Sequence, residues 1–299
     1  MFDIRSNPYF LPSNSSKTMK RILFLSLIAL SVACSHDPKP TDAENSSEVK
    51  TALEPNVVGE EVTYTGDSIT MKGYIAYDAN LEGPRPGVVI VHEWWGHNEH
   101  TRNAADKLAK AGYVAFAVDM YGDGQTAEHP SDAGAFASSV MSDFPGAKAR
   151  FNAALEQMKT NPMCSQTDIA AVGYCFGGGV VLNLARQSAD LDAVATFHGS
   201  IGPIEEATPG SVKAKLLVMN GQDDPFVDQE SIDDFKAEMD AAGVDYEFVN
   251  YAGAVHAFTN PMATDKGIEF DLPLAYNKEA DEQSWAKLEA FLAEVFAKN

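Results

Sequence analysis

Apolar positions along this chain follow two spacings that alternate from residue 62 onward. Short, almost continuous apolar runs predict buried strands, whereas apolar residues that recur every three or four positions predict helices. Two segments near the start, Val62–Thr65 and Met71–Tyr77, predict a hairpin at the edge of a sheet. The other expected strands are Val88–Val91, Val114–Val118, Ile169–Gly173, Ala193–Phe197, Leu216–Met219 and Tyr246–Tyr251. The expected helices are Arg102–Ala111, Asp132–Met141, Ala147–Lys159, Val180–Gln187, Glu230–Ala242 and Glu279–Ala297.

This alternation predicts the α/β fold class, with a mostly parallel central sheet and helices on both faces. Strands that are apolar on both sides agree with that arrangement, because the helices then cover the whole sheet. In such sheets, binding and catalytic residues collect beyond the carboxyl ends of the strands. Motifs that follow a predicted strand therefore carry the most information about function.

The first part of the chain has the pattern of an export signal. Lys20 and Arg21 precede an apolar run, Ile22–Ala33, that is too short to span a bilayer and ends in small residues before Cys34. We expect a signal peptide over residues 1–33, a flexible polar tether over 34–58 and a folded domain over 59–299. The residues before Cys34 resemble a bacterial lipoprotein box, which makes Cys34 the expected lipidation site. The expected location is the periplasm or the outer membrane of a bacterium, with simple secretion as the alternative.

Acidic residues outnumber basic ones, and the formal net charge is −21. This charge argues against nucleic acid and against an anionic lipid surface as partners. We expect a monomer that acts on a small molecule and that contacts a membrane only through a lipid on Cys34.

A cysteine lies between glycines where a predicted strand meets a predicted helix. The segment reads Gly173-Tyr174-Cys175-Phe176-Gly177, after the apolar run that ends at Val172. A strand, a tight turn and a helix in this order are typical of a nucleophile elbow, where larger side chains beside the nucleophile would clash with neighbouring elements. Cys175 is therefore the candidate nucleophile, because a thiolate attacks acyl carbon once a base removes its proton. A buried structural cysteine is the alternative.

Two later strand ends supply a candidate acid and a candidate base. Asp224 stands at the G-x-x-D spacing from Gly221, and Asp223 is the alternative. His256 follows the last predicted strand and would take the thiol proton and later protonate the leaving group, while the acid holds its tautomer. This order of nucleophile, acid and base along the chain is that of α/β-hydrolases, so we expect the α/β-hydrolase fold.

Backbone donors for a developing oxyanion are expected at Trp94, after the strand Val88–Val91, and at Phe176, after the nucleophile. The side chains expected to line the pocket are Trp95, Tyr121, His198 and Phe258, with core packing as the alternative for Trp95.

One segment superficially matches a zinc-binding H-E-x-x-H helix. It begins His92-Glu93, but its fifth position is Gly96 and it follows a strand instead of lying within a helix. We therefore expect no metal and no cofactor. His97 and His100 are expected to be solvated residues at a helix start.

Taken together, these motifs resemble those of the dienelactone hydrolase family. The resemblance extends over nearly all of residues 60–299. It rests on His92-Glu93-Trp94-Trp95-Gly96, Asp119-Met120-Tyr121-Gly122, Gly173-Tyr174-Cys175-Phe176-Gly177-Gly178, Asp224-Pro225-Phe226-Val227 and His256-Ala257-Phe258. It implies a Cys-His-Asp triad that opens a cyclic enol-lactone. It also implies that Glu93 matches a family glutamate that interacts with the resting thiol and is displaced by substrate.

Two positions depart from the family pattern. The dienelactone-cleaving members place a serine directly after the catalytic histidine and an arginine three residues further on, and both contact the substrate carboxylate. This chain has Ala257 and Asn260 there. Because a buried carboxylate without a cationic partner is costly, an uncharged ester, lactone or thioester is an equally open expectation.

Two other functions stay open at this point. One is a non-catalytic envelope protein that uses the scaffold for binding, although an intact triad argues against it. The other is an esterase or peptidase with a larger acyl substrate, whose lid would have to come from Gly122–Pro145.

Overall fold

The computed structural model describes residues 54–297. The predicted signal peptide, Cys34 and nearly all of the predicted tether lie outside the described residues, so they stay predictions. The first strand, β1 (Val57–Gly66), begins just before the expected domain boundary at residue 59. Within residues 54–297, no helix combines the length and the apolar character that crossing a membrane requires.

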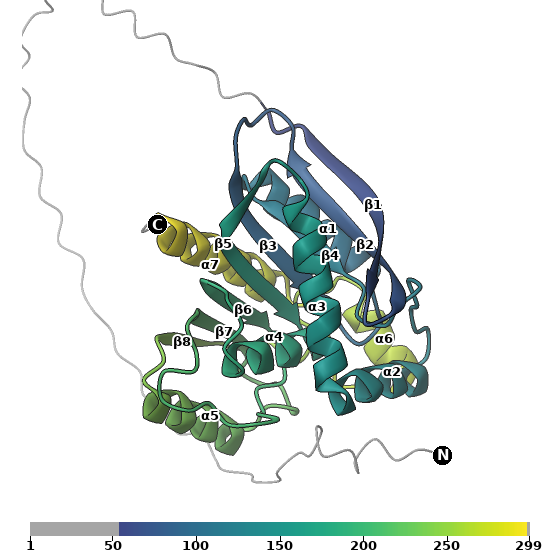
Figure 1. Ribbon diagram of the computed structural model, residues 1–299. Coiled ribbons are helices and arrows are strands. Elements are labelled where there is room, and N and C mark those ends of the chain that lie inside the picture. The colour runs from purple at the N-terminus through teal and green to yellow at the C-terminus, as the bar shows by residue number, and fades with distance from the viewer. Residues whose placement is uncertain (1–53, 298–299) are drawn as a thin grey trace, which may run out of the picture. The chain divides into compact units, whose positions relative to one another are not determined.

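An eight-stranded sheet with the order β1-β2-β4-β3-β5-β6-β7-β8 forms the centre of the fold (Figure 1). β1 pairs with β2 as an antiparallel hairpin, and β2 also runs antiparallel to β4. All other neighbouring strands are parallel. The predicted edge hairpin and mostly parallel sheet are confirmed. The strands after β1 are β2 (Ile69–Asp78), β3 (Arg85–Val91), β4 (Val114–Val118), β5 (Cys164–Tyr174), β6 (Ala193–Phe197), β7 (Lys215–Gly221) and β8 (Tyr246–Tyr251).

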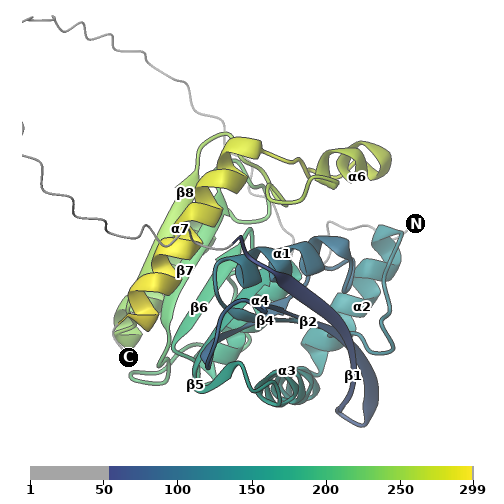
Figure 2. The ribbon, with the colours of Figure 1, turned by 90° about the horizontal axis from the view of Figure 1, so that it is seen from above.

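Helices cover both faces of the sheet, as α1 and α3 show on opposite sides in Figure 2. One apolar core lies between the sheet and α1 and α7, and a larger one lies under α3, α4 and α5. The helices are α1 (Glu99–Lys110), α2 (Pro130–Ser142), α3 (Phe144–Lys159), α4 (Phe176–Arg186), α5 (Gln229–Ala242), α6 (Ala263–Phe270) and α7 (Lys278–Phe296).

One helix was not expected, and several elements begin before their predicted starts, among them β1, α3, α4 and β5. α6 was not expected: it is eight residues long, has no side-chain cap at its start and contains Gly267. That glycine is required by packing, because a Cβ there would overlap the carbonyl of Leu274. β5 begins at Cys164, before the predicted start at Ile169. The prediction missed these first residues because the segment 165–168 is polar and does not have the apolar pattern of a buried strand.

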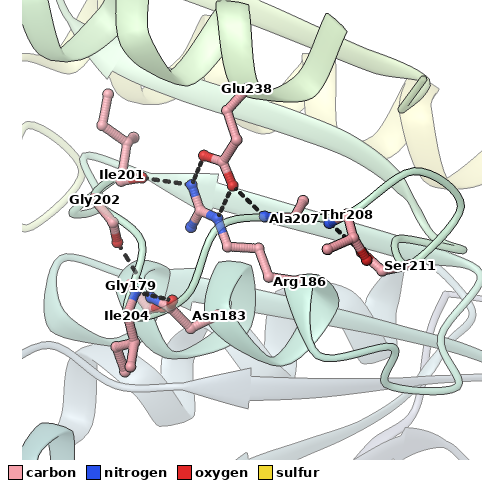
Figure 3. A network of polar contacts seen from close by, with 10 residues as sticks. All are labelled: Gly179, Asn183, Arg186, Ile201, Gly202, Ile204, Ala207, Thr208, Ser211 and Glu238. Carbon is pink, nitrogen blue, oxygen red and sulfur yellow. Dashed lines mark hydrogen bonds and ion pairs between the residues drawn. The ribbon is translucent and has the colours of Figure 1, made fainter. Parts of the chain in front are cut away.

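A buried ion pair fastens the connection between β6 and β7 onto the helices beside it (Figure 3). The Arg186 guanidinium on α4 contacts both carboxylate oxygens of Glu238 on α5, each at 2.8 Å, and also donates to the Ile201 carbonyl. Glu238 accepts a further bond from the Ala207 N–H at 2.7 Å. Nearby, the Asn183 side chain bonds the backbone of Gly202 and Ile204 in the same connection. This network holds the segment that carries Ser200 against the nucleophile-bearing helix.

Replacing Arg186 by Met should therefore lower the free energy of unfolding by about 3–5 kcal/mol, because it leaves the Glu238 carboxylate buried without its partner. Urea denaturation followed by circular dichroism measures the loss. The double variant R186M/E238L should recover most of it, since both charges are then removed. A single variant as stable as the parent protein would show that the pair does not support the fold.

Candidate active site

The turn between β5 and α4 places Cys175 at the carboxyl end of the central strands. Cys175 adopts φ 52° and ψ −116°, a strained conformation for a residue with a side chain. The flanking glycines make this turn possible. A Cβ on Gly173 would overlap the carbonyl of Gly177, and one on Gly177 would overlap the carbonyl of Val91 on β3. At the predicted elbow, the end of β5, the start of α4 and the end of β3 therefore lie in close backbone contact.

The start of α4 is electrostatically suited to a thiolate. Cys175 is the residue immediately before the helix, so the positive end of the helix dipole lies beside its sulfur. Its carbonyl accepts bonds from the N–H groups of Gly178 and Ser200, at 3.0 and 3.3 Å. Those bonds fix the backbone orientation of the nucleophile, which is only 6 % exposed.

Asp224 and His256, the predicted acid and base, are in contact with each other. The Nδ1 of His256 lies 2.7 Å from Oδ2 of Asp224, and the Phe226 N–H donates to the other carboxylate oxygen at 2.9 Å. Asp223, the alternative acid, is exposed. Burial lowers the pKa of His256, but the charges of Asp224 and of the Cys175 thiolate outweigh it and hold the pKa well above its usual value. The imidazole is therefore able to hold a proton next to the sulfur.

The loop that carries His256 is fixed by chain far downstream. His256 forms a parallel bridge with Leu274, and its carbonyl accepts a bond from the N–H of Ala275 at 3.3 Å. Two residues further on, the Phe258 carbonyl accepts from the Asn277 N–H at 3.0 Å. The base is thus positioned by the segment between α6 and α7.

His92 holds together the two loops that follow β3 and β4. Its Nε2 accepts from the Met120 N–H at 3.2 Å, so its Nδ1 carries the proton and donates to the Glu93 carbonyl at 2.6 Å. Burial lowers the pKa of His92 to about 4, which keeps the ring neutral. Next to it, Tyr121 donates its hydroxyl to the Trp94 carbonyl at 2.9 Å. These bonds fix the backbone at Trp94, one of the two predicted oxyanion donors.

Glu93 and Cys175 each lie two residues beyond the last paired positions of β3 and β5, where Val91 pairs with Gly173 in the parallel register. The Glu93 carboxylate is buried and accepts a bond from Nδ2 of Asn260 at 2.5 Å. The amide orientation is determined, because the Asn260 oxygen already accepts from the Met262 N–H at 2.9 Å. Asn260 therefore occupies the family's arginine position with a neutral donor that holds Glu93. Sequence analysis identified this position only as a departure from the family pattern.

A mainly apolar cavity opens beside the nucleophile. Besides Cys175, Phe176 and His256, its walls are formed by Trp94, Gly134, Ala137, Ser138, Met141, Gly179, Ser200, Phe226 and Val227. Sequence analysis did not predict that residues of α2 line the cavity. Most of them have small side chains, and the sequence does not indicate which part of the protein such side chains contact.

The four predicted pocket-lining side chains lie elsewhere. His198 and Phe258 are fully buried behind the base, where His198 bonds the Thr259 hydroxyl at 2.8 Å. Tyr121 packs against His92 and Phe176. The tryptophan Trp95 belongs to a small separate core and lines a different cavity.

One further expectation was wrong: His97 is buried, and its Nδ1 contacts the Lys72 carbonyl at 2.7 Å. The antiparallel hairpin folds over the start of α1, and the sequence pattern around His97 gave no indication of that.

Comparison with known proteins assigns the chain to a family. Residues 71–296 match the model of the dienelactone hydrolase family. The chain belongs to the dienelactone hydrolase family. The predicted resemblance is thereby confirmed, and with it the α/β-hydrolase fold.

Three relatives illustrate the similarity. An Aquifex aeolicus protein, provisionally named a carboxymethylenebutenolidase, is 28% identical over 213 residues, which cover 70% of this chain and 90% of that protein. The crystal structure of a dienelactone hydrolase-like promiscuous phosphotriesterase from metagenomic libraries is 33% identical, with a TM-score of 0.73 over 80% of this chain and 98% of that one. An α/β-hydrolase enzyme from a Medee basin deep-sea metagenome library shares the fold at 16% identity and a TM-score of 0.58, over 81% of this chain and 99% of that one. This member of the dienelactone hydrolase family is a hydrolase, and the family indicates esters or lactones as its substrates.

Asp224→Asn should lower kcat/KM for ester hydrolysis by about 10³- to 10⁴-fold, because the amide no longer stabilises an imidazolium at His256. Asp223→Asn is the matched control and should leave kcat/KM nearly unchanged, since Asp223 is exposed. Steady-state kinetics on an activated ester compares the two variants. Equal losses in both would remove Asp224 from the role of the acid.

Glu93→Gln should speed alkylation of Cys175 by iodoacetamide at pH 7 by about fivefold, because it removes a negative charge beside the forming thiolate. The glutamine oxygen can still accept the bond from Asn260, so the change isolates the charge. Mass spectrometry of the labelled peptides gives both cysteine rates in one sample, with Cys164 as the internal control. An unchanged rate at Cys175 would show that Glu93 does not restrain the thiol.

Proposed function

We propose that this chain hydrolyses small, uncharged esters or lactones through a Cys175–His256–Asp224 triad. The observation that carries the proposal is the 2.7 Å contact between His256 and Asp224 beside a strained Cys175 at the floor of an apolar cavity. An apolar cavity with a few convergent polar groups is the usual setting for a small-molecule reaction.

In the first half of the proposed reaction, the Cys175 thiolate attacks the carbonyl carbon of the substrate, and the carbonyl oxygen becomes an oxyanion. We assign the stabilisation of this oxyanion to the backbone N–H groups of Phe176 and Trp94. Phe176 is the first residue of α4, whose leading N–H groups have no partner within the helix. The C–O bond to the leaving group then breaks, and the leaving oxygen takes the proton of the His256 imidazolium.

In the second half, water attacks the acyl-cysteine while His256 accepts a proton from it. Collapse of this intermediate breaks the C–S bond, returns the sulfur as a thiolate and releases the carboxylic acid. Asp224 stays ionised throughout and stabilises the imidazolium in both halves.

The charges around the cavity support an uncharged substrate. None of the residues that line the cavity is a lysine or an arginine. The two positions that hold the carboxylate in the dienelactone-cleaving members are Ala257, which is buried, and Asn260, which is engaged with Glu93. An adjacent groove carries the carboxylates of Glu206, Asp228 and Asp234, which would repel an anionic substrate.

The test is a substrate panel for the parent protein, Cys175→Ala and Cys164→Ala. Cys164 is the matched control, because it is also buried and burial raises its pKa to about 11. The panel holds p-nitrophenyl esters, a neutral lactone, a carboxylated dienelactone and a phosphotriester, the last because of the activity named for one relative.

Turnover of neutral esters or lactones should fall by about 10³-fold or more in Cys175→Ala and persist in Cys164→Ala. Mass spectrometry of quenched reactions should find the acyl group on the Cys175 peptide. Preference for the carboxylated dienelactone would overturn the assignment of an uncharged substrate. A folded parent protein that turns over nothing in the panel would favour the non-catalytic binding function.

A further inference from the structure

One face of α2 forms a wall of the catalytic cavity. The residues of this helix that line the cavity are Gly134, Ala137, Ser138 and Met141. Their spacing puts all four on the same side of an α-helix. Ala133 and Val140 anchor the helix to the protein, whereas Ala135 between them is exposed. Ala137 and Met141 also pack against the larger core, so the cavity-lining face of the helix is held in place from both sides.

The size of these side chains controls how much room the cavity has. A Cβ added to Gly134 would meet only the ring of Trp94, at 4.0 Å, so this end of the cavity is open for a substrate group. Ala137 and Ser138 are also small, and Met141 closes the row with a flexible apolar chain. The cavity is also lined by Trp94, Phe226 and Val227, so the space beside α2 is mainly apolar.

The position of His256 separates the acyl side from the leaving-group side. The leaving oxygen must lie beside His256, whose ring packs edge-on against Phe226 with centroids 5.0 Å apart. Phe226 and Ser200 also line the adjacent groove, so the leaving group points toward that groove. The acyl chain then extends in the other direction, between Trp94 and α2.

We propose that the inner face of α2, formed by Gly134, Ala137, Ser138 and Met141, determines which acyl groups the enzyme accepts. This proposal rests on the proposed hydrolysis and adds its specificity: the acyl group is uncharged and apolar, and its permitted length is set by the side chains at 137 and 141. The leaving group is selected elsewhere.

The experiment compares Ala137→Leu with Ala135→Leu in the full chain. Both changes add the same atoms to α2, but only the first points into the cavity. The substrates are p-nitrophenyl esters from acetate to octanoate, which vary the acyl group, and acetates of several phenols, which vary the leaving group. Thermal unfolding is recorded for each protein.

Ala137→Leu should lower the ratio of kcat/KM for octanoate to that for acetate by about tenfold or more, because added methylenes fill the slot. Met141→Ala should shift the ratio the opposite way. Ala135→Leu should leave the ratio as in the parent protein. The dependence on the leaving group should stay the same in all variants.

An unchanged acyl ratio in both Ala137→Leu and Met141→Ala, in folded proteins that still hydrolyse esters through Cys175, would overturn the role of α2. A change in leaving-group dependence instead would reverse the assignment of the two sides. Absence of Cys175-dependent turnover in the parent protein is a different result, because it removes the proposed hydrolysis itself.

Discussion

The site depends on a single steric constraint: the backbone that follows β5 must pass within contact distance of the backbone that follows β3. Only glycine at 173 and 177 permits this approach. The same approach forces Cys175 into a positive φ and makes it the residue that begins α4. Its carbonyl accepts the first N–H groups of the helix, from Gly178 and Gly179, and also the Ser200 N–H from the connection after β6. One close contact thus sets the orientation of the nucleophile, the start of the helix and the edge of the cavity.

The buried charges near that contact differ in how they are compensated. Asp119 accepts four backbone N–H bonds and serves only to shape the loop after β4. Asp224 has one backbone donor and the imidazole, so its charge acts on His256. Among the described residues, the Glu93 carboxylate accepts one hydrogen bond, from the neutral side-chain amide of Asn260. A carboxylate with so few donors exerts a strong field on its surroundings, because little of its charge is neutralised by hydrogen bonds.

Sequence analysis predicted most of the elements, because strands buried on both faces stay apolar for their whole length. It identified Cys175, Asp224 and His256 as candidates because each follows a strand end and few residue types can do that chemistry. The features that it missed arise where segments that are distant in the sequence come into contact in the fold. Asn260 and Glu93 are 167 residues apart, and the wall made by α2 has no charged or nucleophilic motif to mark it. Sequence analysis did not predict α6, because an eight-residue helix that has no side-chain cap and contains a glycine shows too little helical periodicity to be recognised.

The bridge between His256 and Leu274 makes the site depend on nearly the whole described domain. Cys175 is held where the backbone after β5 meets the backbone after β3. The loop that carries Asp224 is bonded to the chain around the end of β8, since the N–H groups of Gln222 and Asp223 donate to the carbonyls of Tyr251 and Ala254. The loop that carries His256 is held in turn by residues 274–277. A chain that ended before residue 274 would therefore keep the glycines of the Cys175 turn but lose the contacts that hold its histidine partner.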